Sequence, residues 1–360
     1  MTKKLLFLNG LAILMIPLQH AAAYGLQAMF EWTDRYLPVE VPNYDLLGTV
    51  PYYVLTFIRQ LSTFSVPSFL LISGFFVAFL ATGKEGKVTW EMVMPRVRVL
   101  LYPFVIWTII RYALLRRWPI SFDEVLNPYA FVPLLIQFYL LSPFLVSIAK
   151  TRWKLLLGTV AILHLGIQSI DYLQAMGVTF PGQAFLIQVT PRWFILGQQP
   201  FWFPFGVVLG LHFRNLAAYL SQIKWKLLIA TVVFLLLTIV EYQIADYRNG
   251  EMWIGAGFNG FARNFYILLV ILLILALDET KLPFSKSIAN LGAKSMGIYM
   301  ANIPAIYLAA VLMYHATPWL LGIQVIYFII LFIVGLGGPL LLMWLVRQSP
   351  LRVNYRYLFG

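Results

Sequence analysis

Long apolar stretches, each close to the length needed to cross a lipid bilayer, recur along this whole chain. A transmembrane helix needs about 20 mostly apolar residues. Of the 360 residues, 61% are apolar and 11% are charged, whereas about a quarter of an average soluble domain is charged. The sequence therefore predicts an all-α, polytopic membrane helix bundle in a single domain, 1–360, with short loops. We expect about ten transmembrane helices: 5–26, 56–82, 97–117, 130–149, 154–174, 199–213, 225–245, 261–277, 295–314 and 319–346.

The basic residues lie mainly in the short segments between apolar stretches. A net charge of +12 would otherwise suggest nucleic acid as a partner, but this distribution is the positive-inside pattern of a membrane protein. The partner that the sequence predicts is therefore the lipid bilayer and not nucleic acid. If the N-terminus is cytoplasmic, the ten helices also place the C-terminus inside. The inner segments then hold 18 of the 26 basic residues: Lys3, Lys4, Lys84, Lys87, Arg96, Arg98, Lys150, Arg152, Lys154, Arg214, Lys224, Lys226, Lys281, Lys286, Lys294, Arg347, Arg352 and Arg356.

Residue types that carry much enzyme chemistry are scarce. The chain has no cysteine, which excludes disulfides, thiolate metal sites and a cysteine nucleophile. With four histidines, we expect no metal site. Any acyl transfer must proceed without a thiol on the protein.

The first apolar segment carries two polar residues, Asn9 and His20, on one stripe. They are eleven positions apart, which is about three helical turns with an offset near 20° and a rise of about 16 Å. A polar pair on an apolar helix should face the protein interior because lipid penalises it. A neutral imidazole there can take a proton from a hydroxyl. The alternative is a histidine that hydrogen-bonds only in helix packing.

The same segment has features of a secretory signal peptide. Lys3 and Lys4 precede the apolar stretch, and Ala21, Ala22 and Ala23 resemble a cleavage site. The polar residues within the stretch and the many later spans favour an uncleaved first helix instead.

Three predicted outer loops, 27–55, 175–198 and 246–260, are longer than a turn requires. They are rich in proline, glycine, tyrosine and tryptophan. Loops of this length in a compact protein are usually functional, so we interpret them as a lid or a rim that binds an acceptor. Packing of an aromatic belt at the membrane interface is the alternative.

Several segments, taken in order, resemble membrane acyltransferase family 3. The first helix of that family typically has an arginine, ten residues and a histidine. In the stretch FLNGLAILMIPLQH, His20 matches the histidine, but Asn9 stands at the arginine position. Near the penultimate helix the family often has histidine and then proline, where this chain has Asn302 and Pro304. The similar segments cover nearly the whole chain: 7–20, FLLISGFF (69–76), PRVRVLLYPFVIW (95–107), FYLLSPFL (138–145), FPFGVVLGL (203–211) and LGAKSMGIYMANIPAI (291–306).

This resemblance implies an enzyme of the cell membrane that transfers an acyl group, often acetyl, to a hydroxyl. The implied donor is cytoplasmic acyl-CoA, used as a co-substrate without a permanently bound cofactor. The implied acceptor is a carbohydrate of an exported or lipid-linked glycan. His20 would act as the general base. The candidate substrate-binding residues are Asn9, Ser73, Arg96, Arg98, Arg111 and Asn302.

Several of these roles have alternatives. Arg96 and Arg98 lie at the cytoplasmic mouth of the third helix, where guanidinium groups can clamp the phosphates of CoA; positive-inside anchoring would also explain them. The oxyanion of the tetrahedral intermediate needs a donor, for which Ser73, Asn302, Arg111 and Tyr299 are candidates. The charge missing at Asn9 would have to come from elsewhere, and the candidates are Arg59, Arg111, Arg192 and Arg263.

Two other function classes fit the same spans. A transporter or flippase would also have about ten helices and an internal polar stripe. A non-catalytic family member would account for Asn9 and Asn302 at positions where the family has an arginine and a histidine. Replacement of His20 separates the classes, because only in the enzyme does it abolish product acylation.

Overall fold

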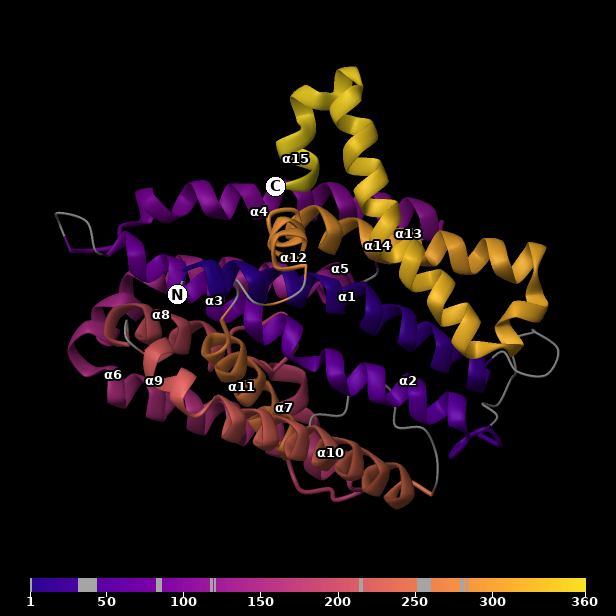
Figure 1. Ribbon diagram of the computed structural model, residues 1–360, viewed down its shortest axis with the longest axis horizontal. Helices are drawn as coiled ribbons and strands as arrows, with labels where there is room; N and C mark the ends of the chain where they lie inside the picture. The colour runs from indigo at the N-terminus through magenta and orange to yellow at the C-terminus, as the bar shows by residue number, and fades with distance from the viewer. Residues whose placement is uncertain are drawn as a thin grey trace.

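The computed structural model is an all-α bundle of long helices (Figure 1). It describes residues 2–31, 44–81, 86–116, 119, 121–213, 216–250, 260–278, 282 and 284–360. The predicted outer loops 27–55 and 246–260 lie partly outside these residues. Lys84, Arg214 and Lys281, which entered the predicted topology, also lie outside them.

Within the described residues, seven helical stretches are long and apolar enough to span a membrane. They are α1 (Thr2–Glu31), the stretch formed by α2 (Val50–Leu61), η1 (Ser62–Phe64) and α3 (Ser65–Leu80), α4 (Trp90–Leu115), α6 (Phe131–Ala175), α10 (Lys224–Arg248), α13 (Ser295–Ala316) and α14 (Gln324–Gln348). Two shorter apolar helices are α8 (Trp202–His212) and α11 (Phe261–Ala276). The polytopic helix bundle is therefore confirmed, whereas the count of ten spans and the N-in, C-in orientation stay predictions. The remaining elements are α5 (Phe122–Leu126), η2 (Asn127–Tyr129), α7 (Gln183–Val189), α9 (Leu216–Gln222), α12 (Ser285–Gly292), η5 (Pro318–Gly322), η6 (Pro350–Asn354) and α15 (Tyr355–Phe359).

Helix α6 joins two of the predicted spans, 130–149 and 154–174. Its 45 residues would make an unbroken helix of about 68 Å, roughly twice the bilayer core. Arg152 interrupts it with non-helical backbone angles, φ −136° and ψ 42°. The break lies in the basic segment between the two predicted spans, so the two halves can cross the membrane separately.

A second break separates α2 from α3. Pro67 lies three residues into α3 and has no N–H to donate to the carbonyl of Thr63. The hydroxyl of Ser62 donates to the Ile58 carbonyl at 2.6 Å, and that of Ser65 donates to the Ser62 carbonyl at 2.6 Å. These bonds accompany the short 3₁₀ turn η1. The turn lies immediately after Arg59, which is 6% exposed.

Helix α1 lies in the middle of the bundle (Figure 1). It contacts α2, α3, α11, α12, α13 and α14. Asn9 donates from Nδ2 to the Gly292 carbonyl at 2.8 Å, and Gly10 approaches the backbone of Ile288 so closely that it has no room for a Cβ. The predicted polar stripe of α1 therefore faces protein along its length.

Helix α8, with 11 residues, is shorter than the seven spanning stretches, and it packs tightly on α3. Two glycines make this possible. An added Cβ at Gly74 would lie 2.1 Å from the Phe203 carbonyl oxygen, and one at Gly206 would lie 2.0 Å from the Leu71 carbonyl oxygen. Small residues at such an interface let two membrane helices approach closely. The glycine of the ISGFF segment therefore has a packing role.

Gly74→Ala is expected to destabilise the protein, because its methyl group would displace α8 from α3. Overpacking of a well-packed site costs about 1–3 kcal/mol. The measurement is the unfolding midpoint of the detergent-solubilised protein. Gly166→Ala is the matched control, since Gly166 is also helical but has no atom within 4 Å of an added Cβ. An unchanged midpoint in Gly74→Ala would contradict the close packing.

Candidate active site

His20 on α1 pairs with Asn302 on α13. The His20 Nδ1 and the Asn302 Oδ1 are 2.6 Å apart. Asn302 is fully buried, and its Nδ2 donates to the carbonyls of Ile298 at 3.0 Å and Tyr299 at 2.5 Å. These two acceptors define the amide orientation, so the atom that faces the ring is the oxygen. An amide oxygen only accepts, and Nδ1 therefore carries the proton while Nε2 keeps its lone pair.

Pro304 contributes to this region of α13. It cannot donate to the carbonyl of Met300, four residues earlier. The Tyr129 hydroxyl donates to that carbonyl at 3.1 Å. Pro304 thus leaves one carbonyl of α13 without its helical hydrogen bond, and the Tyr129 side chain supplies the missing donor near Asn302.

His20 lines a cavity of about 280 Å³. Among the described residues that line it, three are arginines and none is a carboxylate. The arginines come from separate parts of the chain, since Arg59 is on α2, Arg192 precedes α8 and Arg263 is on α11. Its other polar lining residues are Gln19, Thr63, Asn127, Gln198, Gln199 and Tyr299.

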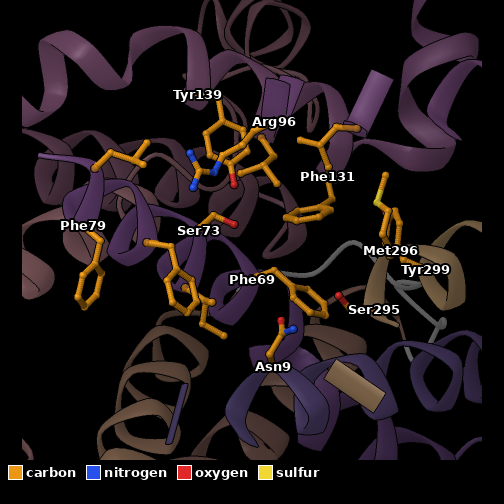
Figure 2. A pocket seen from close by; sticks show the side chains of 15 residues that line it. Asn9, Phe69, Ser73, Phe79, Arg96, Phe131, Tyr139, Ser295, Met296 and Tyr299 are labelled. Carbon is orange, nitrogen blue, oxygen red and sulfur yellow. The ribbon is translucent and has the colours of Figure 1, made fainter. Parts of the chain in front are cut away.

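A second cavity, of about 480 Å³, lies toward the N-terminal end of α1 (Figure 2). Its wall is mostly apolar and is formed by α1, α3, α4, α6 and α13. In Figure 2, Arg96 and Tyr139 lie together with Ser73 close by, and Asn9 lies across the cavity from them. We refer to it as the inner cavity, because it lies at the end of the bundle predicted to be cytoplasmic.

The inner cavity and the His20 cavity have two residues in common. Phe131 and Tyr299 line both. Their rings are 5.4 Å apart and edge-on, and the Phe69 ring lies 5.6 Å from that of Phe131. An aromatic wall therefore separates the two cavities.

A third cavity, of about 830 Å³, adjoins the His20 cavity on its other side. Asn127, Arg192 and Gln198 line both. The wall of this third cavity is more polar and includes Asp171 on α6 and Asn249 after α10. We refer to it as the outer cavity, because Asp171 and Asn249 lie at helix ends that the predicted topology places outside.

A model of one protein family, described as an acyltransferase domain, matches residues 5–344. The chain belongs to membrane acyltransferase family 3. It is therefore a multi-pass membrane acyltransferase, an enzyme that transfers groups other than aminoacyl groups. No curated protein and no solved structure gives a significant match. The matched region contains both His20 and Asn302, so the predicted resemblance is confirmed over nearly the whole chain.

The predicted substrate-binding residues of this acyltransferase do not all come together. Asn9, Ser73 and Arg96 line the inner cavity. Arg98 is exposed on α4 and is not among the residues that line a described cavity, although Arg96 is only two positions away.

Two further predicted residues, Arg111 and Asn302, also line neither the inner cavity nor the His20 cavity. Arg111 lies over the ring of Tyr112, 5.2 Å from its centroid, and lines neither the inner cavity nor the His20 cavity. Asn302 lies behind the His20 ring and lines neither of these two cavities. Its amide groups are all used by His20, Ile298 and Tyr299.

Two other polar residues within the apolar segments, His164 and Glu241, have structural roles. His164 on α6 is buried with Gln168 and bonds Asn264 of α11 at 3.2 Å. Glu241 accepts from the backbone N–H groups of Phe261 at 2.9 Å and Ala262 at 3.0 Å, so it caps α11. Both groups hold α11 against its neighbours.

Sequence reasoning missed several cavity residues. Phe131 and Gln199 lie at the starts of apolar segments, where their side chains gave no sign of a site. The predicted acceptor rim 175–198 was the one useful signal, because Arg192 and Gln198 belong to it. This segment also supplies Gln188 and Thr190 to the outer cavity.

Cysteines introduced into the inner cavity and the outer cavity are expected to react with a labelling reagent from opposite faces of the membrane. Because the chain has no cysteine, Ser295→Cys in the inner cavity and Gln188→Cys in the outer cavity each give a single labelling site. A membrane-impermeant maleimide should modify Gln188→Cys in intact spheroplasts and Ser295→Cys only in inside-out vesicles. Labelling of both variants from the same face would contradict the predicted orientation.

Proposed function

We propose that this acyltransferase moves an acyl group, acetyl in the simplest case, from cytoplasmic acyl-CoA to a hydroxyl of an exported or lipid-linked glycan. His20 acts as the general base. The observation that carries the proposal is the series of three adjoining cavities with His20 in the middle one. Such an arrangement lets a donor enter from one face of the membrane and an acceptor from the other. The proposed location is the cell membrane.

The inner cavity suits the donor. It is mostly apolar, as a thioester-bearing arm requires, and it contains a cation at one side. The Arg96 guanidinium can bind a phosphate of CoA with paired hydrogen bonds. Ser73 and Asn9 supply further hydrogen-bonding groups along the path. Asn9 carries no charge, so Arg96 is the cation that this cavity offers a donor.

The His20 imidazole is prepared for base catalysis. Its Nδ1 donates to Asn302, which holds the ring and leaves the Nε2 lone pair available. Nε2 takes the proton of the acceptor hydroxyl while that oxygen attacks the thioester carbonyl carbon. When the tetrahedral intermediate collapses, the carbon–sulfur bond breaks, and the CoA thiolate takes the proton from the imidazolium. The products are the ester and free CoA. Asn302 thus acts as a positioning residue.

Tyr299 is the proposed donor to the oxyanion. Of the four candidates from the sequence, it is the one that lines both the inner cavity and the His20 cavity. Ser73 lines the inner cavity alone, and Asn302 has no free amide hydrogen. A donor placed where the thioester meets the acceptor is what stabilisation of the developing charge requires.

The outer cavity suits a carbohydrate acceptor. Its wall carries amide, hydroxyl and carboxylate groups that can hydrogen-bond sugar hydroxyls. They include Asn127, Gln174, Gln188, Thr190 and Asp171. Asn127 and Gln198 continue from this wall into the His20 cavity, so a bound sugar is led toward the base.

His20→Gln is expected to abolish acylation of the cell's glycans or glycolipids. Loss of a general base lowers the rate by about 10²–10⁴-fold. The measurement is mass spectrometry of glycans and lipids from cells with the wild-type protein, without it, and with the variant. The acyl mass increment should be present only with the wild type.

His164→Gln is the matched control for this experiment. His164 is a buried, hydrogen-bonded membrane histidine that lines none of the three cavities. Its variant should retain acylation when it is produced at the level of the wild type. Acylation that persists at full level in His20→Gln would overturn the role of His20.

Arg96→Ala is expected to raise the KM for acetyl-CoA by roughly tenfold or more, since a hydrogen bond between charged groups is lost. Arg98→Ala is the comparison, because it removes an equal charge from the same helix but from an exposed position. The measurement is acyl transfer by the purified protein at varied acetyl-CoA concentration. An equal rise of KM in both variants would mean that overall positive charge at this membrane face attracts CoA and that the cavity does not bind its phosphates.

A further inference from the structure

We infer that the acceptor carries an anionic group, a carboxylate or a phosphate, which binds beside His20 to an arginine cluster formed by Arg59, Arg192 and Arg263. This inference rests on the proposed function, because it assigns the chemistry of the acceptor in the same site. It adds a ligand class that the family resemblance does not supply.

The arginine cluster is built by three distant segments of the chain. Arg59 comes from the last turn of α2, Arg192 from the turn before α8, and Arg263 from the first turn of α11. All three line the His20 cavity. Each is close enough to interact electrostatically with the other two. The fold therefore brings three like charges into a space of about 280 Å³.

The charge of the cluster is not balanced by the described cavity wall. Among the described residues, Asp171 lies within electrostatic reach of Arg263, and Asp246 lies within electrostatic reach of Arg59. Neither lines the His20 cavity, and both hold other hydrogen bonds. Asp171 accepts from Gln198 at 2.8 Å, and Asp246 accepts from Tyr52. The described wall of the His20 cavity thus carries three positive charges and no negative one, and bringing like charges together in a buried space is costly. An anionic ligand would remove that cost.

Arg59 gives independent evidence for a ligand. It is 6% exposed, and its Nε and Nη1 are buried without a hydrogen-bond acceptor in the described part of the chain. Buried side-chain donors are nearly always hydrogen-bonded. These two unused donors on a buried guanidinium group are available to the oxygens of a carboxylate or a phosphate.

The position of the arginine cluster assigns the anion to the acceptor. Arg192 also lines the outer cavity, whereas none of the three arginines lines the inner cavity. The positive field thus extends from His20 toward the proposed acceptor entrance. All three arginines lie on the predicted outer half of the protein, where positive-inside anchoring does not explain them. The His20 cavity has the size of the smallest ligand pockets, so its occupant is about one sugar residue.

The test is binding of small sugars to the purified full-length protein in detergent, followed by calorimetry. Glucuronate probes a carboxylate, glucose 1-phosphate probes a phosphate, and glucose is the neutral comparison. We expect at least one of the two anionic sugars to bind roughly tenfold or more tightly than glucose, because hydrogen bonds between charged groups are stronger than neutral ones. Whichever anionic sugar binds more tightly identifies the anion.

Arg59→Gln and Arg263→Gln should each remove most of this preference. Arg248→Gln is the matched control, since Arg248 is an exposed arginine at the predicted outer end of α10 that lines none of the three cavities. Its variant should keep the preference. The unfolding midpoint without ligand separates binding from folding, because neutralising one of three mutually repelling charges should not lower it. Equal binding of anionic and neutral sugars, or a preference that survives both cluster variants, would overturn the inference.

Binding and acylation measured with the wild type and with His20→Gln distinguish failure of this inference from failure of the proposed function. His20→Gln should bind the anionic sugar as tightly as the wild type, because binding does not need the base. Acylation of glucose as fast as of its anionic counterparts would contradict the anionic subsite and leave the His20 mechanism standing. An arginine-dependent preference together with full acylation by His20→Gln would support the anionic subsite and contradict the His20 mechanism.

Discussion

The structure depends on a constraint that lipid imposes on α1. A membrane helix can carry asparagine, glutamine and histidine only if protein surrounds them, because hydrocarbon offers no hydrogen bonds. Helix α1 meets this requirement by lying in the middle of the bundle, where α12 and α13 supply the partners of Asn9 and His20. The bond between His20 and Asn302 therefore serves two purposes. It satisfies a polar group inside the membrane, and it leaves the lone pair of the opposite ring nitrogen available for the proposed base catalysis.

A similar constraint explains the arginine cluster. Eight basic residues do not follow the predicted positive-inside pattern, and Arg59, Arg192 and Arg263 are three of them. Guanidinium groups kept inside a membrane protein against mutual repulsion imply a function that uses their charge. The inner cavity, in contrast, has Asn9 where the family has an arginine. Its cation is Arg96, which comes from the N-terminal part of α4, the end predicted to be cytoplasmic. In the proposed reaction, charge is thus placed at the donor entrance and around the acceptor site, while the neutral Asn9 lies along the donor path.

Much of the fold could be predicted from the sequence because the helices are long and strongly apolar. The stripe of Asn9 and His20 was also predictable, since helical geometry alone relates residues eleven positions apart. For Arg96 and Arg98, helical geometry could have predicted more than it was used for. Two positions correspond to about 200° around a helix, so both side chains could not enter one cavity. The convergence of Arg59 with Arg263, 204 positions later, has no local signal. It depends on how the turn η1, which follows α2, packs against α11, and only the assembled bundle determines that packing. The role of Asn302 was hidden for the same reason, because its partner lies on α1.

The order of the three cavities determines which substrate must cross the aromatic wall of Phe131 and Tyr299. Asn9 and His20 share one stripe of α1 but line cavities on opposite sides of that wall, about 16 Å apart along the helix axis. The inner cavity is mostly apolar, whereas the His20 cavity carries three arginines. A sugar with an anionic group would lose its partners if it moved inward, but an uncharged thioester arm loses little by passing between two rings. In the proposed reaction the donor therefore extends outward to His20 while the acceptor stays on the arginine side. The same wall limits the access of cytoplasmic water to the thioester, so transfer to the sugar is favoured over hydrolysis.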